Sequence, residues 1–184
     1  IYVNEILYLS KIKPVPGRLE CIANLNNNSN IIVDFAHTPE ALEQSLIALK
    51  KQFKKKILIV LGAYYEDISI DLLKNAHRYL NTNNFKNYKV KEVPGVFEIP
   101  VVIARNIKKY DGFIALGCVI KGQTPHFDFI SKATTDAIMK LSIENKKPVG
   151  NGIITCLNKK QAVDRSKTKG QEAAKAVVHI LNHH

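Results

Sequence analysis

The sequence is poor in the features that mark secreted, membrane and metal-binding proteins. Its three cysteines, Cys21, Cys118 and Cys156, are odd in number and far apart, which favours reduced thiols over a disulfide framework or a zinc site. No apolar run approaches the roughly 20 residues needed to span a bilayer, and no basic stretch followed by an apolar run opens the sequence. We therefore expect a cytoplasmic protein without a metal or a membrane segment.

The net charge of +11 does not carry the pattern of a nucleic-acid-binding protein. Residues 1–53 hold 5 basic and 5 acidic side chains, and residues 54–184 hold 22 and 11, so the excess lies in the second part. The lysines occur singly or in pairs and triplets, with no arginine-rich arm and no helix-turn-helix pattern. A basic surface that attracts phosphorylated, anionic metabolites explains the charge, and we expect no nucleic-acid partner.

Strands and helices alternate from residue 57 onward, which indicates an α/β fold. Parallel strands joined by right-handed helical crossovers give this alternation, with helices on both faces of the sheet. Two further helical stretches are expected to carry the chain to its end. The expected strands are 57–61, 88–93, 112–119 and 149–155, and the expected helices between them are 67–80, 97–108 and 127–144.

The first 53 residues predict a short αβ extension. A polar turn at 26–30 precedes a strand at 31–35, and a helix follows with Thr38 as its N-cap and Pro39 in its first position. Its apolar face is expected to include Leu42, Leu46 and Leu49. A charged run at 50–56 separates this extension from the rest of the chain.

Residues 117–128 (GCVIKGQTPHFD) form the first candidate functional loop. They follow a buried strand, and open α/β sheets bind ligands at the carboxyl ends of their strands. Histidine is the side chain best suited to moving protons near neutral pH. No Gly-Lys-Ser/Thr closes the loop, so it is not a nucleotide phosphate loop.

Three segments in order resemble the lumazine synthase family: residues 93–100 (VPGVFEIP), 115–128 (ALGCVIKGQTPHFD) and 169–174 (KGQEAA). The resemblance covers about residues 56–182. It implies a flavodoxin-like three-layer sandwich with a four-stranded parallel sheet. It also implies a homo-oligomer, either a pentamer or a sixty-subunit shell, with active sites between adjacent subunits.

The reaction implied by the resemblance belongs to riboflavin biosynthesis. It condenses 5-amino-6-(D-ribitylamino)uracil with 3,4-dihydroxy-2-butanone 4-phosphate to give 6,7-dimethyl-8-ribityllumazine, phosphate and water. The steps are imine formation, phosphate elimination and ring closure, and none needs a cofactor or a metal. They need two substrates held together, proton transfer, and stabilisation of the phosphate charge.

The resemblance assigns proton transfer to His126 and phosphate binding to Arg165. Gln123 and Thr124 offer backbone amides and a hydroxyl beside them, a nest-like arrangement that suits an anion. By the residues alone, His126 would be a loop histidine that hydrogen-bonds or faces water. Arg165 would by the same token be a solvated arginine on a helix face.

The aminouracil ring needs an aromatic surface and polar contacts. Tyr64 matches the family's stacking aromatic, and the adjacent Tyr65 is a rival. The side chain of Phe97 is expected to lie mostly in the core. Asn151 stands where the family often has an aromatic, and Lys169 matches a position contributed across the subunit interface. The expected substrate-binding residues are Tyr64, Val96, Phe97, Glu98, Val119, Ile120, Gln123, Thr124, Asn151, Arg165 and Lys169.

Residues 15–20 (VPGRLE) and 33–40 (VDFAHTPE) look like a different family, the Mur ligases, at the junction of their central and C-terminal domains. The ATP-binding loop of that family appears nowhere in the chain, so we expect no nucleotide to bind beside Asp34 and His37. We therefore interpret residues 1–53 as a non-catalytic Mur-ligase-like extension and residues 54–184 as a lumazine synthase domain. The alternatives are a flavin- or ribityl-binding module without turnover and a peptidoglycan-precursor ligase fragment.

Overall fold

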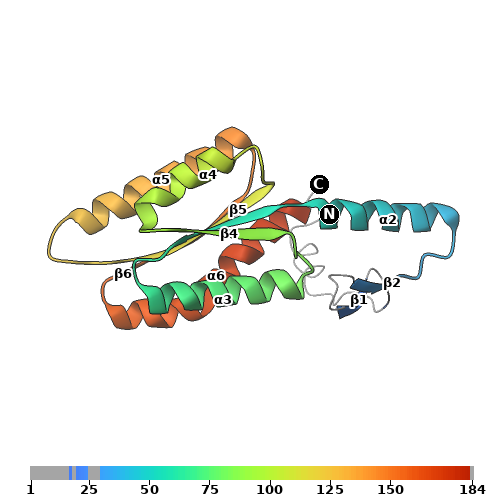
Figure 1. Cartoon of the computed structure of the whole chain (residues 1–184), viewed down its shortest axis with the longest axis horizontal. Helices are drawn as coiled ribbons and strands as arrows, with labels where there is room; N and C mark the ends of the chain where they lie inside the picture. The colour runs from blue at the N-terminus through green and yellow to red at the C-terminus, as the bar shows by residue number, and fades with distance from the viewer. Residues whose placement is uncertain (1–16, 18–19, 25–29, 183–184) are drawn as a thin grey trace, which may run out of the picture. The chain divides into compact units, whose positions relative to one another are not determined.

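The computed structural model describes residues 17, 20–24 and 30–182 (Figure 1). The chain divides into two compact units, residues 1–51 (unit 1) and 52–184 (unit 2), and each is treated by itself. Most of the predicted turn, residues 26–29, lies outside the described residues. Within the described residues, no helix combines the length and the apolar character that crossing a membrane requires.

Unit 2 contains a four-stranded parallel sheet with the strand order β4-β3-β5-β6 (Figure 1). The predicted α/β architecture with this sheet is therefore confirmed. Its elements are β3 (Ile57–Gly62), α3 (Glu66–Thr82), β4 (Tyr88–Val93), the 3-10 helix η1 (Val96–Glu98), α4 (Ile99–Asn106), β5 (Gly112–Ile120), α5 (His126–Asn145), β6 (Val149–Cys156) and α6 (Lys159–Asn182).

Helices cover both faces of the sheet and give three layers. Along β3 the side chains alternate: Ile57 and Ile59 pack with α3 and α6, whereas Leu58 and Val60 pack with α4 and α5. Every residue of β3 is buried, as expected for a central strand of a parallel sheet. The result is two hydrophobic cores, one on each side of a shared sheet.

The end of the chain forms one continuous helix, α6, so the prediction of two helical stretches was wrong. Gly170 lies inside this helix, where α6 meets α3. A Cβ atom at Gly170 would lie 1.9 Å from the carbonyl oxygen of Leu72. The glycine is therefore needed for the close approach of two helices and not for a turn.

Unit 1 contains an antiparallel hairpin, β1 (Glu20–Asn24) and β2 (Asn30–Val33), followed by α2 (Pro39–Lys54). Strand β1 was not predicted, and the strand expected at 31–35 ends at Val33. The hydroxyl of Thr38 accepts a hydrogen bond of 3.2 Å from the backbone nitrogen of Ala41, which confirms the predicted N-cap. Leu42 and Leu46, expected on a packing face, are exposed.

Candidate active site

The carboxyl ends of β3, β4 and β5 meet at one edge of the sheet through glycines. A Cβ at Gly62 would lie 3.0 Å from the carbonyl carbon of Gly95, and a Cβ at Gly117 would lie 2.5 Å from Cγ1 of Val96. Larger residues at these positions would push η1 away from the sheet. The glycines therefore fix η1, and Val96 with it, against the ends of β3 and β5.

The turn before α4 presents backbone amides at this edge. Glu98 accepts a hydrogen bond of 3.0 Å from the backbone nitrogen of Gly95, which holds the turn closed. The first amides of a helix lack partners within the helix, so they can bind oxygen atoms of a ligand. Val96 is buried, but Phe97 is 58% exposed, so the expectation that its ring lies mostly in the core was wrong.

Tyr64 and Tyr65 follow β3 at the same edge. Their rings meet edge to face, with centroids 4.9 Å apart. Tyr64 is the more open ring, with 75% of its surface exposed, whereas Tyr65 packs against the core on the α3 and α6 side. Burial is the main cause that raises the pKa of Tyr65. Between the two rivals, Tyr64 offers the free aromatic surface.

Ser69 anchors this turn, and nothing in the sequence singled it out. Its buried hydroxyl donates a hydrogen bond of 2.8 Å to the carbonyl oxygen of Gly62. Its backbone nitrogen also donates to the carbonyl oxygen of Tyr65, at 2.9 Å. Ser69 thus ties the start of α3 to the end of β3 and fixes the tyrosine pair. A lone serine inside a helical pattern gives no sign of such a role before the fold is known.

The loop between β5 and α5 lies open beside these elements. Its first residue, Lys121, is held to β6 by a hydrogen bond of 2.8 Å from its nitrogen to the carbonyl oxygen of Cys156. Gln123, Thr124 and His126 are all exposed, and His126 is the first residue of α5 rather than part of the loop. A helix N-terminus with free amides favours a bound anion.

The backbone of this loop is available to a ligand. A Cβ at Gly122 would meet no atom within 4 Å. In the part of the chain that the structure describes, the backbone amides of Gly122, Gln123 and Thr124 make no hydrogen bond. Unpaired amides next to a helix N-terminus are the usual elements of a phosphate cradle.

Helix α6 brings a guanidinium to the same end of the sheet. Arg165 donates a hydrogen bond of 2.9 Å from Nη1 to the carbonyl oxygen of Thr155, which pairs in register with Val119. Arg165 is therefore held beside the carboxyl ends of β5 and β6. Lys169, about one turn further along α6 and so about 6 Å from Arg165 along the axis, pairs with Glu172, and its hydrogen bond lowers the pKa of Glu172.

Asn151 is not gathered with these residues in a single chain. It pairs in register with Ala115, in the middle of the sheet. It lies five residues before the end of β6 at Cys156, which is roughly 17 Å at about 3.3 Å per residue. Its side-chain oxygen accepts a hydrogen bond of 3.0 Å from the backbone nitrogen of Ile153. Within one chain, Asn151 therefore lies apart from the residues at the carboxyl edge.

Cys118 and Cys156 are buried free thiols on the face of the sheet that packs against α3 and α6. Burial, together with the neighbouring Cys156, raises the pKa of Cys118 from 9.0 to about 12. A thiol with such a pKa stays protonated at neutral pH and is a poor nucleophile. Among the described residues, no group of three or more His, Cys, Asp or Glu side chains could hold a metal ion.

Two family models match the chain. The model for 6,7-dimethyl-8-ribityllumazine synthase matches residues 54–184, and the model for the glutamate ligase domain of Mur ligases matches residues 17–83. The two matches overlap over residues 54–83, which include β3 and α3. The second match extends well past the short resemblance at residues 15–40.

Curated relatives agree with the first model. The 6,7-dimethyl-8-ribityllumazine synthase of Bartonella tribocorum is 40% identical over 142 residues, which cover 72% of this chain and 93% of the relative. The enzyme of that name from Corynebacterium kroppenstedtii is 39% identical over 130 residues, 67% of this chain and 81% of the relative. A third, from Rhodopseudomonas palustris, is 40% identical over 137 residues, 68% of this chain and 83% of the relative.

Proposed function

The chain belongs to the 6,7-dimethyl-8-ribityllumazine synthase family, and we propose that its carboxyl-edge site carries out the reaction of that family. The substrates are two small molecules, 5-amino-6-(D-ribitylamino)uracil and 3,4-dihydroxy-2-butanone 4-phosphate. The products are 6,7-dimethyl-8-ribityllumazine, phosphate and water. The observation that carries the proposal is the meeting of η1, the open loop at Gly122–Thr124 and His126 at one sheet edge.

The geometry suits each need of this condensation. The exposed ring of Tyr64 offers a stacking surface for the uracil, and the amides of η1 can bind its oxygen atoms. The free amides beside the N-terminus of α5 can hold the phosphate. His126, at that same terminus, is placed to take a proton from the carbon next to the imine as the phosphate leaves.

The active site is proposed to be shared between copies of the chain. Asn151 lies roughly 17 Å from the carboxyl edge of its own sheet, and Lys169 lies about one helical turn beyond Arg165, facing its own Glu172. A neighbouring subunit that presents these residues would complete the site, in a pentamer or a sixty-subunit shell. The free thiols of Cys118 and Cys156 support a cytoplasmic location.

The direct test is to mix the full chain with both substrates and to follow lumazine fluorescence. We expect product to form without added metal or nucleotide. A chain that binds the lumazine tightly but forms none would instead be a ribityl-compound binding module. That result would remove the proposed function.

A second candidate, a ligase role for unit 1, rests on the match over residues 17–83. In the described part of unit 1, the carboxylate of Asp34 already accepts hydrogen bonds from the nitrogen of Ala36, at 2.8 Å, and the hydroxyl of Ser45, at 3.1 Å. The sequence also has no phosphate loop. We therefore propose that residues 1–53 are a non-catalytic extension and residues 54–184 the catalytic domain.

Replacing Arg165 with alanine is expected to raise KM for the phosphorylated substrate roughly 10- to 100-fold, because a charged hydrogen bond to phosphate contributes about 1.5–3 kcal/mol. KM for the aminouracil should change little. Steady-state kinetics with each substrate varied in turn would measure the difference. Lys160→Ala, an exposed cation in the first turn of the same helix, is the matched control. Equal effects of the two substitutions would contradict the role of Arg165.

A further inference from the structure

The helix of unit 1 carries an apolar face that no other described residue of unit 1 covers. Every hydrophobic side chain that the structure describes as buried lies between Ile57 and Leu181, in unit 2. In α2, Leu42, Leu46 and Ile47 are 50%, 56% and 50% exposed. A unit of this size seldom buries enough apolar surface by itself, and oligomerisation is a common remedy.

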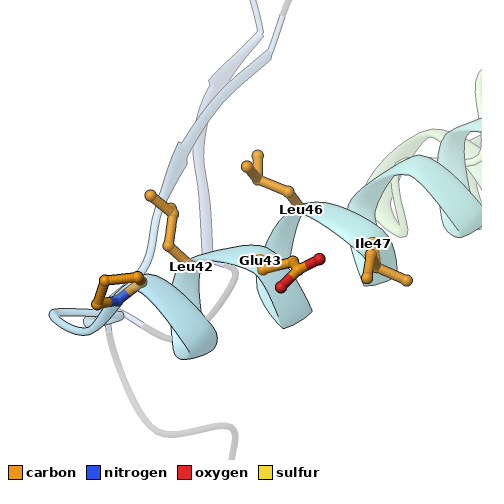
Figure 2. Close-up of a pocket in the computed structure, with 5 residues that line it drawn as sticks. Leu42, Glu43, Leu46 and Ile47 are labelled. Atoms are coloured by element: carbon orange, nitrogen blue, oxygen red, sulfur yellow. The ribbon is translucent and has the colours of Figure 1, made fainter.

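This face points away from the hairpin of unit 1. Ser45, on the other side of α2, donates its hydroxyl hydrogen to Asp34 beyond the end of β2, and so marks the inward side. The outward side contains a shallow hollow of about 390 Å³ (Figure 2). The hollow is lined by Pro39, Leu42, Glu43, Leu46 and Ile47.

Charge along this face changes sign from one end to the other. At about 100° per residue, positions 43, 46, 47, 50 and 54 share one side of the helix. The sequence has glutamate at position 43 and lysine at positions 50 and 54. A second α2 in antiparallel orientation would set position 43 of each copy against position 50 of the other. A parallel copy would set glutamate against glutamate.

We propose that this face is an interface between two copies of the chain, formed by antiparallel pairing of their α2 helices. The pairing is self-complementary, as a twofold interface must be, because one set of residues serves both copies. Leu46 and Ile47 lie next to the twofold axis, and position 43 of each copy faces position 50 of the other. The proposed interface uses residues of unit 1 alone, and its formation does not depend on turnover.

Cysteine crosslinking tests the orientation of the two helices. In a full chain carrying Cys21→Ser, the substitution Leu46→Cys is expected to give a disulfide-linked dimer under mild oxidation, because the two residues flank the axis. Pro39→Cys should not, since antiparallel copies place the two positions roughly 22 Å apart, far beyond disulfide reach. Absence of the Leu46→Cys dimer, or equal crosslinking at position 39, would overturn the proposal.

A charge exchange tests the partner independently. In the Leu46→Cys chain, adding Glu43→Lys sets lysine against lysine, and adding Lys50→Glu sets glutamate against glutamate. Each variant alone should lose about fivefold or more in dimer yield. An equimolar mixture should restore the yield as a mixed dimer, identified by mass, and recovery would also show that both variants are folded. Full crosslinking of either variant alone, or no mixed dimer, would refute the pairing.

Discussion

Replacing His126 with alanine is expected to lower turnover roughly 10²- to 10⁴-fold, the usual contribution of a positioned general acid or base. His126 begins α5, beside the amides proposed to hold the phosphate, and it is exposed to the space where substrates would lie. Its loss removes the group proposed to move protons during phosphate elimination and should leave the binding surfaces intact. The rate of lumazine formation at saturating substrate measures this effect, and KM for both substrates should change little.

The matched control is another exposed histidine, His37, whose Nδ1 lies 3.0 Å from the carbonyl oxygen of Phe35. His37→Ala should leave turnover unchanged. The side chain of His126 makes no hydrogen bond to another described residue, so His126→Ala should also keep the melting temperature of the parent. If turnover of His126→Ala stayed close to that of His37→Ala, proton transfer would have to be assigned to another group.

Replacing Gly170 with alanine is expected to destabilise unit 2 by about 2 kcal/mol. A Cβ at this position would lie 1.9 Å from the backbone oxygen of Leu72, which cannot rotate away as a side chain could. Overpacking of this kind costs roughly 1–3 kcal/mol and occasionally more, while alanine gains about 1 kcal/mol in helix propensity over glycine. The clash should outweigh the gain because α3 and α6 share a long interface along the buried core.

Urea unfolding of the full chain measures this cost as a lower midpoint at unchanged slope. Gly122→Ala is the control for stability, since a Cβ there meets no atom within 4 Å. Its midpoint should stay that of the parent. A Gly170→Ala chain with the same midpoint would mean that α3 and α6 can separate without loss, against the close contact that the structure shows.

The centre of the sheet could be predicted from the sequence because β3 and β5 are continuous apolar runs. Ile57 to Leu61 are all buried, so no polar residue interrupts the pattern. The end of the chain was harder, since a glycine that ends a helix and one that lets two helices approach look alike until the neighbour is known. Gly170 is of the second kind. Strand β1 is short and begins and ends with polar residues, which hid it.

The exposure of α2 could not be predicted for a different reason. Periodicity shows which side chains share a face, but not whether anything covers that face. Leu42 and Leu46 do share a face, as expected, and yet remain exposed in the described part of unit 1. Where apolar residues recur in a small unit, the question of what they pack against needs the fold.

The candidate site divides in the same way. The strand–loop pattern predicted a site at the carboxyl edge, and the structure places Tyr64, Val96 and His126 there. Ser69 was missed, because its role depends on a tertiary contact with Gly62. Asn151 lies in mid-strand, away from the carboxyl edge, and a single sequence does not show contacts between copies of a chain.

The two buried thiols give this fold a built-in reporter of its own opening. Cys118 and Cys156 lie on neighbouring strands, β5 and β6, and each is almost fully enclosed. A thiol reagent reaches them only while the two strands or their covering helices separate. The labelling rate therefore measures how often this part of the fold opens. Strand β5 also leads into the loop before His126. The same labelling would therefore measure the local opening of β5 and β6, the strand pair that supports this loop.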